Sequence, residues 1–285
     1  MVAPHFFVLG NPRSGTSLFR LMLNSHPHVV VPPECGFLQW WYSKYSTWSQ
    51  SDSVNPYRIA EYVEDLISSK KIETWNLSKS VLINQIGKLK PENYTQLSSI
   101  VYSLYSPHKN GLVGDKNNYY INHTQLIGNL YPDAKIIHLV RDGRDVACSY
   151  LALHSLDSKS VYAPKVSREI DEIATEWSSN TSKLNDFLKD KLGLVIKYED
   201  LILNTEETLK RVCDFLEIQY STNMLRYYEK EFHDEPASTM DWKSKTREKV
   251  DENNIGKYKE ILTQTQIQTF ESIASNELSQ FGYGK

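Results

Sequence analysis

Short runs of apolar residues alternate along this chain with segments in which apolar residues recur every three or four positions. Each short run is bounded by turn residues and predicts a buried strand; the runs lie at residues 6–9, 29–31, 112–114, 135–140 and 194–197. The helical spacing predicts helices at residues 18–22, 119–130, 143–153, 166–188, 206–216, 255–262 and 266–281. Strands that alternate with helices predict an α/β fold, in which helices flank a parallel sheet on both faces.

One long segment does not follow this alternation. Residues from about 40 to 105 are aromatic and polar, with helical spacing near 59–67 and 81–86 and few strand signals. We interpret this segment as a helical insertion. Because no linker rich in Gly, Pro or Ser divides the chain, we expect residues 1–285 to form a single domain that carries the insertion.

Composition and charge narrow the class of protein. Hydrophobic residues make up 40% of the 285 residues and charged residues 24%, as in a typical globular protein. The net charge of -3 argues against a protein that binds nucleic acid through bulk positive charge. The sequence has no run of about 18 apolar residues, so no membrane span is predicted.

The cysteines and the first residues of the chain indicate in which cellular compartment the protein is expected. Cys35, Cys148 and Cys213 lie far apart, and no C-x-x-C pair occurs, so we expect neither a disulfide framework nor a structural zinc site. The first residues carry no basic segment followed by an apolar run of signal-peptide length. We therefore expect a cytoplasmic protein.

A loop rich in turn residues joins the first predicted strand to the first predicted helix. Over residues 10–17 it reads Gly-Asn-Pro-Arg-Ser-Gly-Thr-Ser, which has the G-x-x-x-x-G spacing of a nucleotide phosphate loop. The backbone N–H groups of such a turn and the helix that follows it bind anions. Thr16 stands where ATPases and GTPases carry a lysine, which argues against those activities, while Arg13 places a cation inside the loop.

A second candidate anion site follows the clearest predicted strand. Arg141 comes directly after residues 135–140, at the carboxyl edge of the sheet, where open α/β folds bind ligands. Ser149 lies about two turns into the next predicted helix and can share a side with residues near the start of that helix. An arginine and a hydroxyl at this edge suit a second phosphate group, although an ordinary charged helix start has the same composition.

Together the two motifs resemble those of the sulfotransferase family that uses 3′-phosphoadenosine 5′-phosphosulfate (PAPS). Residues 195–201 and 254–258 resemble further landmarks of this family, and all of these motifs occur in the family's order, whereas residues 40–105 are not covered. The resemblance implies a parallel sheet with a phosphate loop and PAPS as co-substrate. It also implies adenosine 3′,5′-bisphosphate (PAP) as product and no metal ion.

The resemblance further implies which residues bind the donor. The loop would hold the 5′-phosphosulfate through Arg13, Ser14, Gly15, Thr16 and Ser17. Arg141 and Ser149 would hold the 3′-phosphate, and Tyr198 would contact the nucleotide. Ser238 and Lys257 resemble residues that close over the donor in the tyrosylprotein branch of the family.

Three residues are implied in the transfer itself. Arg13 resembles the loop cation that stabilises charge on the bridging oxygen, and Lys116 resembles a lysine that contacts the sulfuryl group. The branch that acts on phenols and steroids uses a histidine as base, in a K-x-H pattern, but the matching position here is Asn118. Glu34 follows a His-Pro turn at residues 26–27 and resembles the glutamate base of the tyrosylprotein and carbohydrate branches.

The sequence leaves the acceptor open. A glutamate base favours a sugar hydroxyl or a peptidyl tyrosine over a free steroid, and a small alcohol or phenol also fits the reaction. The aromatic residues between 40 and 48 suit an acceptor pocket or the core of the insertion equally well. The partners we expect are a hydroxyl-bearing acceptor, no nucleic acid and no membrane span; a homodimer stays open.

Two other functions remain as alternatives. A nucleotide or small-molecule kinase would need a lysine in place of Thr16 and a metal-binding acid, for which Asp115 is a candidate. A nucleotide-binding module without catalysis would not need Arg13 and Glu34. No Cys/His cluster or H-x-x-x-H pattern predicts a metal site.

Overall fold

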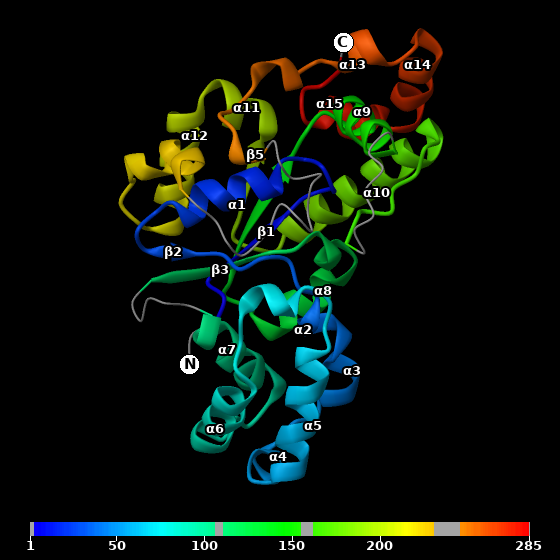
Figure 1. Ribbon diagram of the computed structural model, residues 1–285. Helices are drawn as coiled ribbons and strands as arrows, with labels where there is room; N and C mark the ends of the chain where they lie inside the picture. Colours follow the sequence, from blue (N-terminus) through cyan, green and yellow to red (C-terminus); the bar gives the residue numbers. More distant parts are fainter. Residues whose placement is uncertain (1–2, 106–110, 155–161, 231–245, 285) are drawn as a thin grey trace. The chain divides into compact units, whose positions relative to one another are not determined.

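The secondary structure follows the alternating pattern of the sequence. The computed structural model describes residues 3–105, 111–154, 162–230 and 246–284 (Figure 1). The chain divides into two compact units. Unit 1 consists of Met1–Phe7 and His28–Lys135, and unit 2 consists of Val8–Pro27 and Ile136–Lys285. The interpretation of the whole chain as one domain stays a prediction.

The strands form one sheet in the order β2-β3-β1-β4-β5. Their bounds are β1 Phe6–Leu9, β2 Val29–Val30, β3 Leu112–Lys116, β4 Lys135–Val140 and β5 Gly193–Lys197. The pair β2 and β3 is parallel, with Val30 opposite Val113, and the pair β4 and β5 is parallel, with His138 opposite Val195. The parallel α/β fold predicted from the sequence is thereby confirmed.

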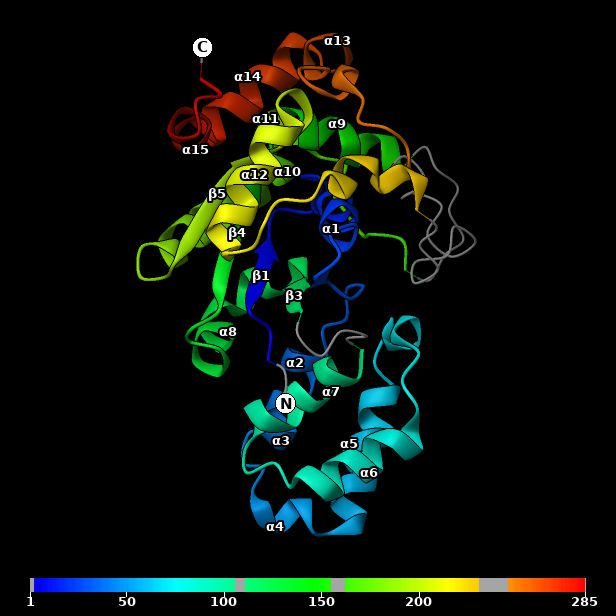
Figure 2. The same ribbon diagram turned by 90° about the vertical axis from the view of Figure 1, so that its left-hand side faces the viewer.

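Unit 1 contains the predicted helical insertion. The helices of unit 1 are α2 Phe37–Trp40, α3 Tyr42–Tyr45, α4 Gln50–Ser53, α5 Pro56–Ile67, η1 Ile72–Trp75, α6 Lys79–Leu89, α7 Tyr94–Tyr105, η2 Asn118–His123 and α8 Thr124–Leu130. Helix α5 packs against α6, and α6 against α7 (Figures 1 and 2). The buried rings of Tyr45, Trp48 and Tyr62 pack together, with 5.0 Å between the centroids of Tyr45 and Tyr62. Tyr45 and Trp48 therefore belong to the core of the insertion.

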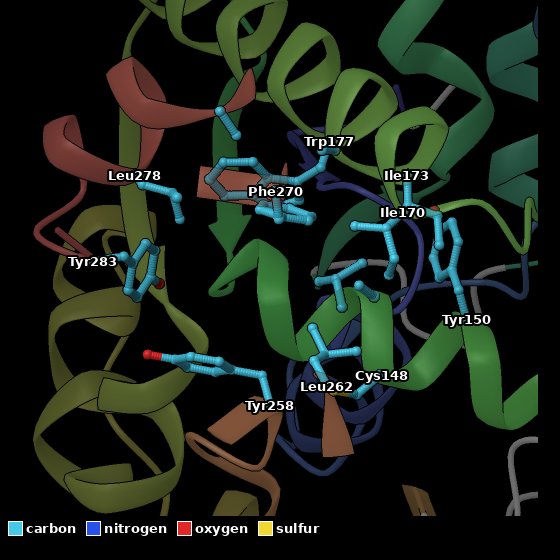
Figure 3. Close-up of a cluster of buried hydrophobic side chains, with 14 of the residues drawn as sticks. Cys148, Tyr150, Ile170, Ile173, Trp177, Tyr258, Leu262, Phe270, Leu278 and Tyr283 are labelled. Carbon is cyan, nitrogen blue, oxygen red and sulfur yellow. The ribbon is translucent and has the colours of Figure 1, made fainter. Parts of the chain in front are cut away.

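Unit 2 contains the remaining helices. They are α1 Thr16–Asn24, α9 Gly143–His154, α10 Ile170–Leu188, α11 Tyr198–Leu203, α12 Thr205–Leu216, η3 Thr222–Glu229, η5 Glu252–Asn254, α13 Tyr258–Ile261, α14 Gln264–Ile273 and α15 Ser275–Gln280. Helix α10 packs against both α9 and α14. Figure 3 shows the apolar core at this junction, in which the rings of Trp177 and Phe270 lie 5.9 Å apart. This core fixes α9, the helix that carries Ser149.

Several predicted helices differ from the structure; the one expected at 266–281, for example, divides into α14 and α15. Residues 119–130 form the 3-10 helix η2 followed by α8, because the backbone N–H of Tyr120 bonds to the carbonyl of Asn117 and the N–H of Tyr119 to its side chain. In residues 255–262 only Tyr258–Ile261 is helical, since Gly256 has a left-handed φ of 71°. Helix α11 was not predicted.

Two general expectations can be compared with the structure. All three cysteines are buried and free. Among the residues that the structure describes, none of the helices combines the length and the apolar character needed to cross a membrane.

Candidate active site

The loop between β1 and α1 has the backbone of an anion-binding turn. The N–H of Ser14 bonds to the carbonyl of Asn11 at 3.1 Å, and Arg13 and Gly15 both adopt left-handed conformations, with φ of 69° and 93°. Gly15 occupies the N-cap position of α1, and the described side chains provide no cap there. The first N–H groups of α1 thus lack a side-chain cap in the described part of the chain, which is the arrangement typical of a helix that binds an anion at its start.

Gly15 is required by its surroundings as well as by its backbone. A Cβ atom at this position would lie 2.5 Å from Cδ2 of Tyr198, a distance shorter than any real contact. The ring of Tyr198 also lies 4.3 Å from the guanidinium carbon of Arg141, which is a cation–π contact. Tyr198 thus joins the phosphate loop to the second predicted anion site.

Arg13, Arg141 and Ser149 meet in unit 2. Nε of Arg13 donates a hydrogen bond to Oγ of Ser149 at 3.0 Å. Nη1 of Arg141 donates to the carbonyl of Arg13 at 3.2 Å, and Nη2 donates to the carbonyl of Asn254 at 2.6 Å. Nε of Arg141 is buried and has no hydrogen-bond partner among the described residues. The two motifs, 128 residues apart at Arg13 and Arg141, form one cationic region.

A buried network of hydrogen bonds connects the loop between β1 and α1 to helices α9 and α10. Nδ2 of Asn180 on α10 donates to Oδ1 of Asn11 at 2.7 Å, and Nδ2 of Asn11 donates to the hydroxyl of Tyr150 on α9 at 3.2 Å. That hydroxyl donates to Oε1 of Glu176 at 3.0 Å, and burial raises the pKa of Glu176. The sequence analysis missed this network, because only Asn11 lies in a recognisable motif.

The C-terminal segment is fastened to α9 through Asp145. Its carboxylate accepts hydrogen bonds from the backbone N–H groups of Gly256 at 2.7 Å and Tyr258 at 3.0 Å. Lys257 lies between them, and its charge lowers the pKa of the Cys148 thiol, although burial has the larger effect and raises that pKa to about 11. Lys257 is therefore close to the helix of Ser149. Ser238, the other predicted donor ligand from this segment, lies outside the described residues.

The predicted base lies in unit 1 between two lysines. Oε1 of Glu34 accepts a hydrogen bond from Nζ of Lys116 at 2.8 Å, and Oε2 accepts one from Nζ of Lys71 at 3.3 Å. Both lysine side chains are buried, at 1% and 9% exposure, whereas that of Glu34 keeps 13%. Glu34 and Lys116, whose roles are both implied by the family resemblance, are thus in direct contact.

The backbone on either side of Glu34 is held in place. Nε1 of Trp75 donates to the carbonyl of Pro33 at 2.9 Å, and Nδ2 of Asn117 donates to the carbonyl of Cys35 at 2.8 Å. The hydroxyl of Tyr120 donates to the same Cys35 carbonyl at 3.3 Å. Asn117 therefore helps to position Glu34. It precedes Asn118, the residue at the position where the histidine branch of the family carries its base.

Asp115 precedes Lys116 and is completely buried. The hydroxyl of Tyr102 donates to its Oδ2, while Oδ1 has no hydrogen-bond partner among the described residues. Burial raises the pKa of Asp115 to about 7, although the hydrogen bond from Tyr102 and the charge of Lys116 lower it. Within the described parts of the chain, no three or more His, Cys, Asp or Glu side chains form a group that could hold a metal ion.

The aromatic residues near Glu34 divide into two kinds. Trp40 is half-buried, and its ring centroid lies 5.8 Å from that of Tyr119, which is 44% exposed. Nζ of Lys71 lies 5.6 Å from the Tyr119 centroid. Trp40 and Tyr119 therefore keep exposed ring surface, unlike Tyr45 and Trp48 in the insertion core.

The candidate residues thus form two groups. The residues predicted to bind the donor that the structure describes lie in unit 2, and the group around Glu34 lies in unit 1. Lys71 is the member of the second group that the sequence analysis missed, and it lies in the segment that the resemblance does not cover.

Comparisons with known proteins place these groups in a family context. The sequence model of the Sulfotransferase family matches residues 4–222. A Caenorhabditis briggsae protein assigned as a protein-tyrosine sulfotransferase is 29% identical and covers 78% of this chain, and protein-tyrosine sulfotransferase A of Caenorhabditis elegans is 23% identical and covers 79%. The chain spans 69% and 53% of the length of these two relatives.

Solved structures give the same fold. The sulfotransferase domain from the curacin biosynthetic pathway has a TM-score of 0.64 at 19% identity, covering 96% of this chain and 98% of that domain. A mouse sulfotransferase solved in complex with PAP has a TM-score of 0.54 at 12% identity, covering 98% of this chain and 86% of that protein. At these identities the likeness concerns the fold.

Proposed function

The chain belongs to the sulfotransferase family, and on this premise we propose that it transfers the sulfuryl group of PAPS to a hydroxyl acceptor. The observation that carries this proposal is the meeting of Arg13, Arg141 and Ser149 at the loop before α1. PAPS carries a 5′-phosphosulfate and a separate 3′-phosphate. A donor with two anionic groups matches two adjacent anion-binding motifs better than a single triphosphate does.

Each donor-binding residue has a defined part in this proposal. The loop from Arg13 to Ser17 binds the 5′-phosphosulfate through backbone N–H groups and the start of α1. Arg141 and Ser149 bind the 3′-phosphate, Tyr198 contacts the nucleotide, and Lys257 approaches the donor from the C-terminal segment. The mouse sulfotransferase named above was solved with PAP, the product that this reaction would release.

The transfer itself uses Glu34, Arg13 and Lys116. The acceptor oxygen forms a bond to sulfur, the bond from sulfur to the bridging oxygen breaks, and PAP leaves. Glu34 takes the proton of the acceptor hydroxyl, and Lys116 contacts the sulfuryl group. Arg13 stabilises the negative charge that grows on the bridging oxygen, which is the interaction that lowers the barrier.

The acceptor is proposed as a class. The curated relatives carry the name protein-tyrosine sulfotransferase, so the phenolic hydroxyl of a peptidyl tyrosine is the first acceptor to test. A sugar hydroxyl and a small alcohol or phenol are the other members of the class. The aromatic faces of Trp40 and Tyr119 suit any of these acceptors. A cytoplasmic location and a homodimer stay predictions.

A donor competition assay tests the proposal. The protein is incubated with tyrosine peptides, oligosaccharides and phenols, and with either PAPS in EDTA or ATP with Mg²⁺. We expect a mass gain of one sulfuryl group with PAPS, with the same rate in EDTA as in Mg²⁺. Phosphorylation with ATP, or transfer that EDTA abolishes and Mg²⁺ restores, would instead favour a nucleotide or small-molecule kinase.

A further inference from the structure

Lys71 contacts the proposed base from the helical insertion. Its Nζ lies 3.3 Å from Oε2 of Glu34, while Lys116 occupies the other oxygen at 2.8 Å. Lys71 comes between α5 and η1, so among the described residues the insertion supplies one of the cations on this carboxylate. We propose that Lys71 is a positioning residue that keeps Glu34 ionised and oriented as the base, an inference that rests on the proposed function.

The backbone of Lys71 supports a specific role for its side chain. Its φ of 68° lies in the left-handed region, which a lysine adopts at a cost that glycine would avoid. The residue is nevertheless buried, and its carbonyl accepts the N–H of Thr74 at 3.1 Å and the Thr74 hydroxyl at 2.6 Å. The start of η1 therefore holds a lysine, in a strained conformation, with its ammonium group against Glu34.

The segment from Lys71 to Trp75 also contacts the backbone next to Glu34. Trp75, at the end of η1, donates from its indole to the carbonyl of Pro33, one residue before Glu34. Residues 71–75 thus fix both the carboxylate and the main chain, as Asn117 does from the other side at Cys35.

The charges around Glu34 set the direction of the effect. Lys71 and Lys116 favour its ionised form, whereas the buried Asp115 on β3 opposes that form only at pH values where Asp115 is itself ionised. The charge of Glu73 on η1 acts at the neighbouring Cys35, whose pKa burial raises to about 12, so the thiol stays neutral. Removing Lys71 takes away one of the ammonium groups that the structure places on Glu34 and therefore favours protonation of Glu34.

The pH dependence of kcat/KM is the decisive readout. In Lys71→Met we expect the acid limb of the profile to move to higher pH by about 1 unit or more, because one adjacent charge is lost. Lys71→Arg should restore the wild-type limb. Lys79→Met is the matched control, since Lys79 pairs with the exposed Glu64 at 2.6 Å in the same insertion. Affinity for PAP should be unchanged in all three variants.

An unmoved acid limb in Lys71→Met would overturn the proposal, as would an equal shift in Lys79→Met. A measurement without donor or acceptor separates this outcome from failure of the proposed function. Carbon-13 NMR should show the Glu34 carboxyl titrating at higher pH in Lys71→Met than in the wild-type chain, whether or not the chain transfers sulfuryl groups.

A further measurement does not depend on the folding of a Lys71 variant. In the wild-type protein, the nitrogen-15 resonance of the Lys71 ammonium should follow the ionisation of Glu34, and this response should disappear in Glu34→Gln. A Lys71 resonance that ignores Glu34 would refute the pairing.

Discussion

Glu34 combines partial exposure with contacts that fix its orientation. Its side chain keeps 13% exposure, while two ammonium groups contact its oxygens and hydrogen bonds hold the carbonyls before and after it. A general base must reach the acceptor proton and must be ionised beforehand, and these contacts serve both needs. Its proposed role is therefore separable from donor binding, which is proposed for residues of the other unit.

Glu34→Gln tests this separation. Glutamine keeps the shape of the side chain but cannot accept a proton, so we expect turnover to fall by about 10²–10⁴-fold with PAP affinity nearly unchanged. Steady-state kinetics and calorimetry measure the two quantities. Glu64→Gln, which changes an exposed glutamate paired with Lys79, should leave both unchanged. Near-normal turnover in Glu34→Gln would refute the assignment.

At the scale of elements, the turn into α1 depends on a glycine. Gly15 combines a φ of 93° with a distance of 2.5 Å from its hypothetical Cβ to the Tyr198 ring, so any side chain must displace the loop or the tyrosine. The loop and α11, to which Tyr198 belongs, are consequently coupled. A change at this turn should alter stability and anion binding together.

Gly15→Ala should therefore lower both the stability of the fold and its affinity for anions. We expect a loss of about 1–3 kcal/mol in the free energy of unfolding, from backbone strain and overpacking, and at least about 10-fold weaker PAP binding. Gly87→Ala is the control, since Gly87 lies within α6 and a Cβ there would meet nothing within 4 Å. It should be neutral or stabilise by about 0.5–1 kcal/mol. Chemical denaturation and calorimetry would contradict the account if Gly15→Ala behaved like Gly87→Ala.

The elements also show what sequence reasoning can and cannot provide. The apolar run at 135–140 became β4 with the predicted bounds, because a short run between turn residues in an alternating pattern has few other interpretations. The start of α13 was placed too early, since the N–H groups of Gly256 and Tyr258 bond to the distant Asp145. Lys71 carries no local signal at all, because its role comes from a contact 37 residues away.

At the scale of the whole molecule, two buried groups give opposite contributions to the pH dependence of stability. Burial lowers the pKa of His138 on β4 to about 4 and raises that of Asp115 on β3 to about 7. In the unfolded chain His138 binds a proton below about pH 6.5, whereas in the folded chain it does so only below about pH 4. Its contribution to the free energy of unfolding is therefore lost as pH falls from about 6.5 to about 4. Folded Asp115 keeps a proton between its unfolded value of 3.8 and about 7, so its contribution decreases as pH rises.

The two groups can be tested as a pair. Between about pH 4 and 6.5, the free energy of unfolding should rise less steeply with pH in His138→Leu than in the wild type, and more steeply in Asp115→Asn. Urea denaturation at several pH values measures both slopes. Parallel curves for all three proteins would show that these groups titrate normally in the folded chain.

The central claim is that the chain is built for a donor with two separate anionic groups, and a binding comparison that does not require the acceptor tests it most directly. Calorimetry with PAP and with AMP should show PAP binding at least about 10-fold more tightly, because the 3′-phosphate adds charge-assisted hydrogen bonds worth about 1.5–3 kcal/mol. Arg141→Met should remove most of this preference, because PAP affinity should fall more than AMP affinity does. Equal affinities of the wild-type protein for PAP and AMP, or a preference that persists in Arg141→Met, would contradict the account.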